Sequence, residues 1–271
     1  MSFNWINPND YSFNSMLLFE RFQIRIMINS NGWWNDKAEW NRNMGIALCA
    51  NPAVAWYFTK LCPDIAQIVS ELIENAPKNV NSEQIREAEV FALQSVEDFT
   101  IYTTPEIMAE KCDFMRGWNK EHLFSLIDFS DKTVLDVGAG SGRLTFAAAE
   151  KAAWVYASEP VGSLREFMRE KAINEGIKNV RVLDGLLPHL PFPDDTFDIV
   201  MSGHVVGGDF DAEIAEMTRV CKSEGWLIDC VGDSECDISS NPKMISCGFE
   251  EISYTGSFGK LVCNYRKQIK K

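Results

Sequence analysis

The hydrophobic pattern of the chain changes character near residue 130. Before that point, apolar residues recur at helical spacing, as in the segment 15–28, and breaks rich in Asn, Pro and Gly separate the segments. After it, short β-branched apolar runs alternate with helical patterns. The pattern therefore predicts an α-helical region over residues 1–129, followed by an α/β domain over residues 130–271.

Two segments of the helical region carry specific end signals. The segment 15–28 predicts one continuous helix that stops at the polar segment 29–32. Asn81 and Gln84 stand three residues apart and resemble a capping box, which opens a helix running toward Phe99. We therefore expect helices joined by short breaks, without the alternating pattern of strands.

Seven strands are expected in the second domain. They are predicted at 133–137, 154–158, 180–183, 198–202, 225–230, 250–257 and 260–265, with helices near 142–151, 163–175, 210–221 and 240–247. Only a short turn at residues 256–259 separates the last two strands, and a parallel crossover needs a dozen or more residues. The prediction is a Rossmann-like doubly wound seven-stranded sheet with an antiparallel C-terminal hairpin.

Composition limits the class of partner. The chain of 271 residues has 26 Lys and Arg against 39 Asp and Glu, which gives a net charge of −13. A surface for nucleic acid or for an anionic membrane needs clustered positive charge, so neither partner is expected. The eight cysteines form no C-x-x-C pair, so we expect reduced thiols and no metal site. Without a signal-peptide pattern or a bilayer-spanning apolar run, the sequence predicts a cytoplasmic protein.

A glycine-rich turn follows the first predicted strand, where the segment 133–143 reads TVLDVGAGSGR. Gly138, Gly140 and Gly142 let the backbone adopt positive φ and let a ligand approach where any Cβ would collide. A dinucleotide-binding fingerprint, G-x-G-x-x-G, needs its third glycine at position 143, where this chain has Arg143. The spacing therefore disfavours a NAD-type site.

What remains is the pattern D-x-G-x-G-x-G from Asp136 to Gly142, and this resembles the class I S-adenosylmethionine (SAM) dependent methyltransferases, in the small-molecule, methyltransferase type 11-like branch. The resemblance extends to Glu159, which closes the second strand, and to the segments 190–200 (LPFPDDTFDIV) and 219–226 (RVCKSEGW). It implies SAM as cofactor and S-adenosylhomocysteine as product.

The resemblance also implies a cofactor site built from the turns after the first four strands. Its residues are Asp136, Gly138, Ala139, Gly140 and Gly142, then Glu159 and Pro160, then Asp184, Gly185 and Leu186, then Ser202 and Gly203, with Arg116 and Trp118 as neighbours that precede the first strand. Glu159 is expected to accept hydrogen bonds from both ribose hydroxyls; the alternative is an acid that only interacts with a helix dipole. Asp136 either orders the glycine turn through backbone N–H groups or attracts the ligand's ammonium through water.

Two further assignments stay open. Adenine is read either by Asp184 or by the backbone at Gly185 and Leu186, because the family's usual acid, counted back from Pro191, falls on Leu186. His204 follows the fourth strand and is either a general base for the acceptor or a packing histidine. The chemistry does not force a base, because in-line positioning against an activated methyl group supplies much of the rate.

Aromatic residues are concentrated before residue 130. They are Trp5, Trp33, Trp34, Trp40, Trp56, Tyr57, Phe58 and Trp118. A lid over the methyl group is one interpretation and core packing is the stronger one, because aromatics at helical spacing usually fill a core. We expect methyl transfer to a small-molecule acceptor, with the helical region completing the substrate pocket. The alternatives are a SAM-binding module without turnover and aminopropyl transfer on the same fold; the pattern specifies neither the methylated atom nor the oligomeric state.

Overall fold

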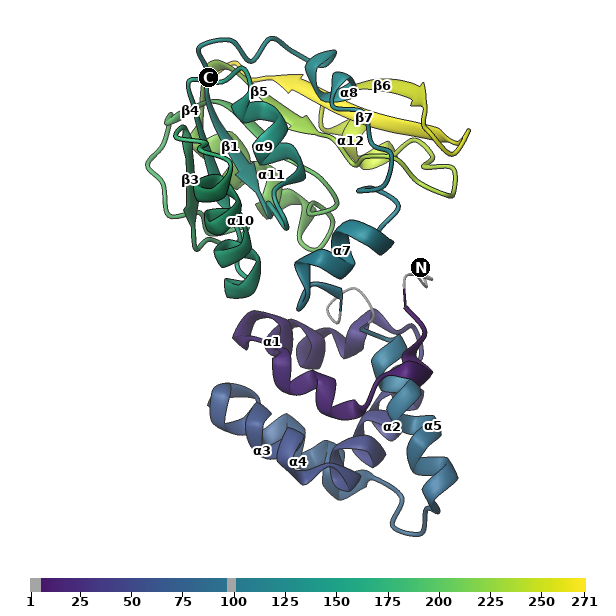
Figure 1. The fold of residues 1–271 in the computed structure, drawn as a ribbon. Helices are drawn as coiled ribbons and strands as arrows, with labels where there is room; N and C mark the ends of the chain where they lie inside the picture. Colours follow the sequence, from purple (N-terminus) through teal and green to yellow (C-terminus); the bar gives the residue numbers. More distant parts are fainter. Residues whose placement is uncertain (1–5, 97–100) are drawn as a thin grey trace. The chain divides into compact units, whose positions relative to one another are not determined.

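The computed structural model describes residues 6–96 and 101–271, which are drawn in Figure 1. They form two compact units, Met1–Thr104 and Pro105–Lys271. This boundary precedes the change of pattern near residue 130, because helices α7 (Pro105–Lys111) and α8 (Glu121–Phe124) contact the helices of the second unit. Within the described ranges, no helix has the length and the apolar composition needed to cross a membrane.

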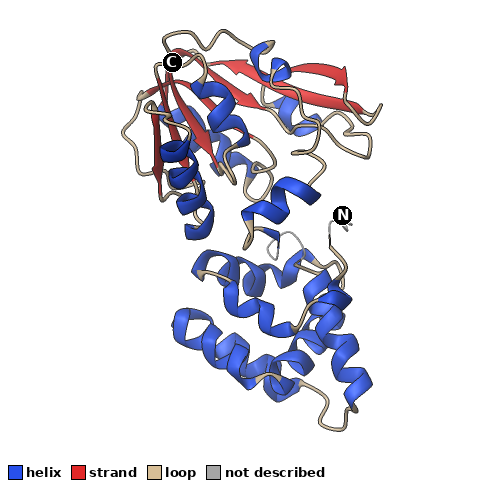
Figure 2. Ribbon diagram, viewed as in Figure 1, coloured by secondary structure: helices blue, strands red, loops and turns tan. Residues whose placement is uncertain are grey.

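The first unit is helical in its described part, as Figure 2 shows. Its elements are η1 (Pro8–Asp10), η2 (Phe13–Leu18), α1 (Arg21–Ser30), η3 (Asn31–Trp33), α2 (Lys37–Ala50), α3 (Pro52–Leu61), η4 (Pro63–Ile65), α4 (Ala66–Asn75) and α5 (Ser82–Gln94). The expected capping box is confirmed at the start of α5, where Asn81 and Gln84 each accept a hydrogen bond from the other's backbone N–H. Phe99, toward which this helix was expected to run, lies outside the described residues.

The single helix expected over residues 15–28 is wrong. The chain instead forms the short 3-10 helix η2 and then α1, because Glu20 makes a capping box with Gln23 and so starts a new helix. Asn31 ends α1 in the left-handed conformation with φ of 54°. The apolar periodicity therefore marks buried positions correctly but does not show the break between them.

Most of the described aromatics of this unit fill its core. Trp40 is fully buried and its Nε1 donates a 3.1 Å hydrogen bond to Ser95, while Phe58 is also fully buried. Trp56 is the exception, with 62% of its surface exposed. Trp5 and the side chain of Trp33 lie outside the described part of the chain.

The second unit contains a seven-stranded sheet. Its strands are β1 (Thr133–Val137), β2 (Trp154–Ser158), β3 (Val180–Leu183), β4 (Phe197–Ser202), β5 (Cys221–Asp229), β6 (Glu250–Thr255) and β7 (Leu261–Gln268), in the order β3-β2-β1-β4-β5-β7-β6. The first five strands pair in parallel, whereas β7 pairs antiparallel to both β5 and β6. The predicted Rossmann-like sheet with a C-terminal hairpin is confirmed, and the strand order reverses between β1 and β4.

Both faces of the sheet are covered by helices, which are α8, α9 (Arg143–Ala149), α10 (Gly162–Asn174), α11 (Phe210–Val220) and α12 (Pro242–Ser246). Leu135 of β1 belongs to the apolar layer that includes residues of α11 and α12. Its neighbour Val134 points to the opposite layer, with residues of α8 and α9. Burial on both faces explains why the strands read as short continuous apolar runs.

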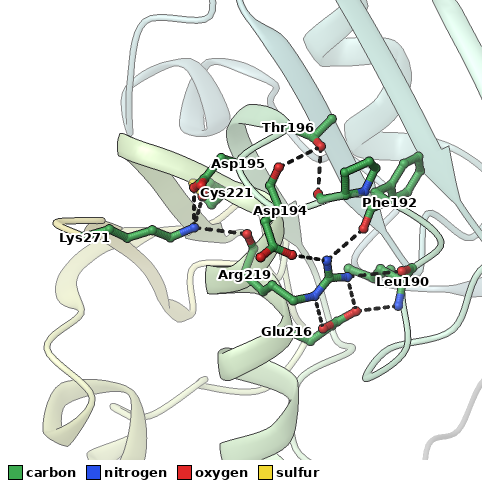
Figure 3. Close-up of polar contacts among 10 residues, drawn as sticks. Leu190, Phe192, Asp194, Asp195, Thr196, Glu216, Arg219, Cys221 and Lys271 are labelled. Carbon is green, nitrogen blue, oxygen red and sulfur yellow. Dashed lines mark hydrogen bonds and ion pairs between the residues drawn. The ribbon is translucent and has the colours of Figure 1, made fainter.

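Arg219 joins the segments 190–200 and 219–226, as Figure 3 shows. Its Nη1 donates hydrogen bonds of 2.8 Å to the carbonyl oxygen of Phe192 and 2.7 Å to Asp194, and its Nη2 donates to Glu216 at 2.7 Å. Lys271 closes the same region by donating to Asp195 at 2.6 Å. This network holds the turn before β4 against the end of α11.

Candidate functional site

The glycine turn lies at the carboxyl end of β1, next to the reversal of strand order. Gly138, Gly140 and Gly142 have φ values of 63°, 57° and 89°, a region that side chains rarely adopt. A Cβ at Gly138 would lie 2.5 Å from a methyl carbon of Val205, and one at Gly140 would lie 3.2 Å from Cε of Met108. Ala139, between the first two glycines, is buried. The turn is therefore a backbone cradle that fits the close approach of a cofactor.

Glu159 directly follows the neighbouring strand β2 and contacts this turn. Its Oε2 accepts a 2.8 Å hydrogen bond from the N–H of Gly140, and its Oε1 accepts a 2.8 Å hydrogen bond from the N–H of Val161 at the start of α10. Only 4% of the residue is exposed, and burial raises the pKa of Glu159 to about 7. A carboxylate has about four lone-pair sites, so two remain for further donors. Pro160, the next residue, lies between Glu159 and the start of α10.

Asp136 is buried within β1 and bonds to a helix. Its Oδ2 accepts a 2.6 Å hydrogen bond from Oγ1 of Thr145 on α9, and burial raises the pKa of Asp136 to about 7. The two interactions expected from the sequence were with the amides of the turn and with a ligand ammonium. The structure adds a third, which ties β1 to the helix that follows the turn.

The turn after β3 brings the backbone of Gly185 close to β2. A Cβ at Gly185 would overlap with Oγ of Ser158, a buried hydroxyl without a hydrogen-bond partner among the described residues. Asp184 is exposed and pairs with Arg165 at 3.4 Å, while Leu186 is 42% exposed. Of the three expected adenine neighbours, Gly185 thus packs directly against Ser158 at the end of β2.

The loops after β4 and β5 lie against each other. The buried hydroxyl of Ser202 donates a 2.9 Å hydrogen bond to Asp229, and a Cβ at Gly203 would lie 2.6 Å from the carbonyl oxygen of Cys230. Burial raises the pKa of Asp229 to about 6. The side chain of Ser202 therefore points along the sheet toward β5, and Gly203 is required for close packing.

His204 has the left-handed backbone conformation, with φ of 63°. Its ring centroid lies 4.9 Å from that of Phe114, and the residue as a whole is exposed to solvent. The surrounding protein atoms, followed by the positive charge of Arg143, lower the pKa of His204 to about 4. The imidazole is therefore uncharged at neutral pH, which leaves it able to accept a hydrogen bond but makes it a weak base.

The two expected neighbours before β1 have different surroundings. Arg116 forms an ion pair with Glu235 and lies 5.4 Å from the ring centroid of Phe258, so the structure does not bring it to the glycine turn. Trp118 lies 4.4 Å from Cζ of Arg143, the residue that directly follows the turn. Trp118 is therefore part of the strand-end site, together with Arg143.

Sequence reasoning missed several residues that the fold brings to this edge. They are Met108, Phe114, Arg143 and Thr145. Arg143 was noticed only because it replaces a glycine, although a charged residue at the first position of an otherwise apolar helix is itself a signal. Phe114 and Met108 carry no such signal, because apolar residues in a helical pattern usually mark core.

Comparison with known proteins identifies the family of the segment that forms this site. Residues 134–225 match the pattern described as a methyltransferase domain. This segment is a class I SAM-dependent methyltransferase domain. The match spans the glycine turn, Glu159 and the 190–200 segment, and it confirms the predicted methyltransferase family for this segment.

Two curated relatives match part of this chain. The uncharacterized methyltransferase YcgJ of Bacillus subtilis is 31% identical over 101 residues, which are 36% of this chain and 40% of YcgJ. The demethylmenaquinone methyltransferase of Thermobifida fusca is 31% identical over 117 residues, 42% of this chain and 50% of the relative. This chain therefore matches half or less of the length of these relatives. A solved SAM-dependent methyltransferase from Aquifex aeolicus is 19% identical with a TM-score of 0.48, covering 61% of this chain and 98% of that one.

Proposed function

We propose that the protein binds SAM at the glycine turn and transfers its methyl group to a small-molecule acceptor by in-line displacement. The observation that carries this proposal is the pair of hydrogen bonds that Glu159 accepts from Gly140 and Val161, 2.8 Å each, at the carboxyl ends of two parallel strands. It brings an acid with spare lone pairs to a glycine-rich turn, which suits a ribose diol beside a close-approaching ligand.

Each residue of the turn has a distinct part in this proposal. The backbone of Gly138 to Gly142 gives the cofactor room, and Glu159 accepts hydrogen bonds from the two ribose hydroxyls while still holding the turn. Asp136 keeps α9 in register with β1 through Thr145. Bound SAM supplies an activated methyl group on a sulfonium, so the protein needs no covalent intermediate.

The acceptor is proposed to lie at the loops after β4 and β5. In this fold these loops face the reacting end of the cofactor, and here they include Gly203, an uncharged His204 and the buried pair of Ser202 and Asp229. Holding the nucleophile in line at contact distance supplies most of the rate in such a site. The net charge of −13 supports a small acceptor over a nucleic acid.

The helical unit of residues 1–104 is proposed to contribute to acceptor choice. All recognisable cofactor residues lie in the second unit, whereas the first has its own core and no match to the methyltransferase pattern. The first unit is therefore the part of the chain that we propose to select the acceptor.

Calorimetry with SAM, S-adenosylhomocysteine and NAD tests the cofactor. The first two are expected to bind and NAD is not, and tight NAD binding without SAM binding would overturn the proposal. Labelled SAM is then incubated with cell-extract metabolites and with demethylmenaquinone, which is included because a relative is named for that activity. SAM binding without transfer to any acceptor would favour a binding module, and turnover of decarboxylated SAM would favour aminopropyl transfer.

A further inference from the structure

The loops after β4 and β5 enclose a guanidinium group that the proposed function does not use. Arg143, the first residue of α9, is partly buried, and its Nη2 donates a 2.8 Å hydrogen bond to the carbonyl oxygen of Cys230. A Cβ at Gly203 would lie 2.9 Å from Nη2, and one at Gly232 would lie 2.8 Å from Nη1. The two glycines thus leave a slot that holds the guanidinium at the carboxyl ends of β4 and β5.

Arg143 has no carboxylate partner in the described part of the chain. It takes part in none of the ion pairs between described residues, and its Nη1 is enclosed without a hydrogen-bond partner among them. Asp136 and Asp229 are close enough to sense its charge, but their carboxylates accept hydrogen bonds from Thr145 and Ser202. Burying a charged N–H donor without an acceptor costs free energy. An anionic oxygen that accepts a hydrogen bond from Nη1 would remove this cost.

Two aromatic rings lie beside this guanidinium. Its Cζ lies 4.4 Å from the ring centroid of Trp118 and 5.8 Å from that of Phe114, and the ring of His204 lies 4.9 Å from Phe114. Nε1 of Trp118 is a second enclosed donor without a partner among the described residues. We call Phe114, Trp118, Arg143 and His204 the Arg143 cluster; it combines flat apolar faces with two unpaired N–H donors.

We propose that the Arg143 cluster binds an ionised oxygen of the methyl acceptor, carried on a planar aromatic frame. Arg143 Nη1 and Trp118 Nε1 are the donors, and the rings of Phe114 and His204 contact the planar frame. This assignment rests on the proposed function and narrows its substrate class to aromatic carboxylates and phenolates. Because both donors are enclosed, binding displaces an aromatic side chain, which predicts a change in indole fluorescence.

The position of the cluster favours the acceptor over the cofactor. Arg143 contacts the backbone that follows β4 and β5, at Gly203, Cys230 and Gly232. The cradle for the cofactor, in contrast, lies at the ends of β1 and β2, where Gly140 and Glu159 meet. The cofactor also carries a carboxylate. The experiment must therefore distinguish binding of that carboxylate from binding of an ionised oxygen of the acceptor.

Benzoate and benzamide are suitable probes, since they share size and shape and differ in charge. Each is titrated into the full-length protein by calorimetry, with and without saturating S-adenosylhomocysteine. The wild type is expected to prefer benzoate by roughly ten- to a hundredfold, as for a hydrogen bond to a charged group, and Arg143→Gln is expected to abolish the preference. Arg181→Gln is the matched control, because Arg181 stacks on Trp154 at 4.3 Å in another part of the sheet, and it should keep the preference.

Equal affinities in the wild type, or a preference that persists in Arg143→Gln, would overturn the assignment. A variant that loses S-adenosylhomocysteine but retains 5′-methylthioadenosine, which lacks the amino-acid part, would place Arg143 on the cofactor's carboxylate and also overturn it. Trp118→Phe keeps the ring and removes Nε1, so it should weaken benzoate and spare benzamide even if Arg143→Gln does not fold. Failure of the wild type to bind S-adenosylhomocysteine contradicts the proposed function alone, because the benzoate preference is measured separately.

Discussion

The N–H of Gly140 donates a 2.8 Å hydrogen bond to Oε2 of Glu159, although 19 residues separate the two along the chain. The contact exists because β1 and β2 pair in parallel, with Val137 opposite Ser158, so that both strands end at the same edge. The glycine turn and the acid are therefore one structural unit. A substitution in either is therefore expected to change the affinity for the same ligand.

Replacing Glu159 should weaken cofactor binding strongly. In Glu159→Gln the ribose hydroxyls lose a charged acceptor, and a hydrogen bond to a charged group contributes about 1.5–3 kcal/mol, so affinity should fall roughly ten- to a hundredfold. Calorimetry with S-adenosylhomocysteine measures this. Glu170→Gln, which changes an exposed acid on α10, the helix after Glu159, is the control. Wild-type affinity in Glu159→Gln would reduce Glu159 to a helix-end acid.

Cofactor affinity should depend on pH near neutrality. Burial raises the pKa of Glu159 to about 7, and ribose hydroxyls donate to the ionised form, so binding must remove the proton at lower pH. Affinity is expected to rise with pH up to about 7 and then level off, with a slope of roughly tenfold per unit below it. Asp136 has a pKa raised to about 7 by burial as well, so Asp136→Asn and Glu159→Gln are titrated separately. A flat profile in the wild type would contradict the ribose role.

The raised pKa values of Asp136 and Glu159 also determine how the stability of the fold changes with pH. Folding favours the protonated form of an acid whose pKa is raised, so this contribution is present at pH 4 and is lost as pH rises through about 7. SAM should therefore raise the Tm of the protein more at pH 8 than at pH 6. Thermal unfolding with and without SAM checks this, and an equal rise at both pH values would count against it.

His204 should remain uncharged well below neutral pH. Its pKa is lowered to about 4, so between about pH 4 and 6.5 the unfolded chain binds the proton more tightly, and stability falls as pH drops through this window. NMR titration follows the protonation of the imidazole, and the signal that is missing in His204→Gln is assigned to His204. A midpoint near 6.5 would restore His204 as a general base suited to neutral pH.

Arg219 is predicted to stabilise the fold without affecting the cofactor. Arg219→Met removes donors to the carbonyl oxygens of Phe192 and Leu190 and leaves Glu216 without its ion-pair partner, which should cost about 1–3 kcal/mol of unfolding free energy. Urea unfolding measures the loss. The exposed pair of Lys120 and Glu150 provides the control, since Lys120→Met should cost at most about 1 kcal/mol. A large loss of SAM affinity at equal stability would show that the turn before β4 also shapes the site.

Removing the helical unit should separate binding from acceptor choice. A fragment of residues 105–271 is expected to bind S-adenosylhomocysteine like the whole chain but to lose activity on the acceptor that the whole chain methylates. Circular dichroism must confirm that the fragment folds. Full acceptor activity in the fragment would make residues 1–104 a structural or partner-binding unit.

Several features of this protein follow from its sequence alone. The bounds of β1, β2 and β3 agree with the structure at both ends, because each is a short buried run bounded by turn residues. The C-terminal hairpin follows from the length of its connection, since four residues at 256–259 exclude a crossover. The meeting of the glycine turn with Glu159 also follows, because neighbouring parallel strands end at one edge.

Only the tertiary structure decided where single side chains point. Phe114 and Trp118 come from one segment and Arg143 and His204 from two others, and no local pattern relates the three segments. The side chain of Ser202 turns toward Asp229, and Arg116 pairs with Glu235 away from the glycine turn, although both stand at positions expected to reach the cofactor. Periodicity records which face of an element is buried, whereas side-chain partners and pKa values depend on burial and charge contributed by distant segments.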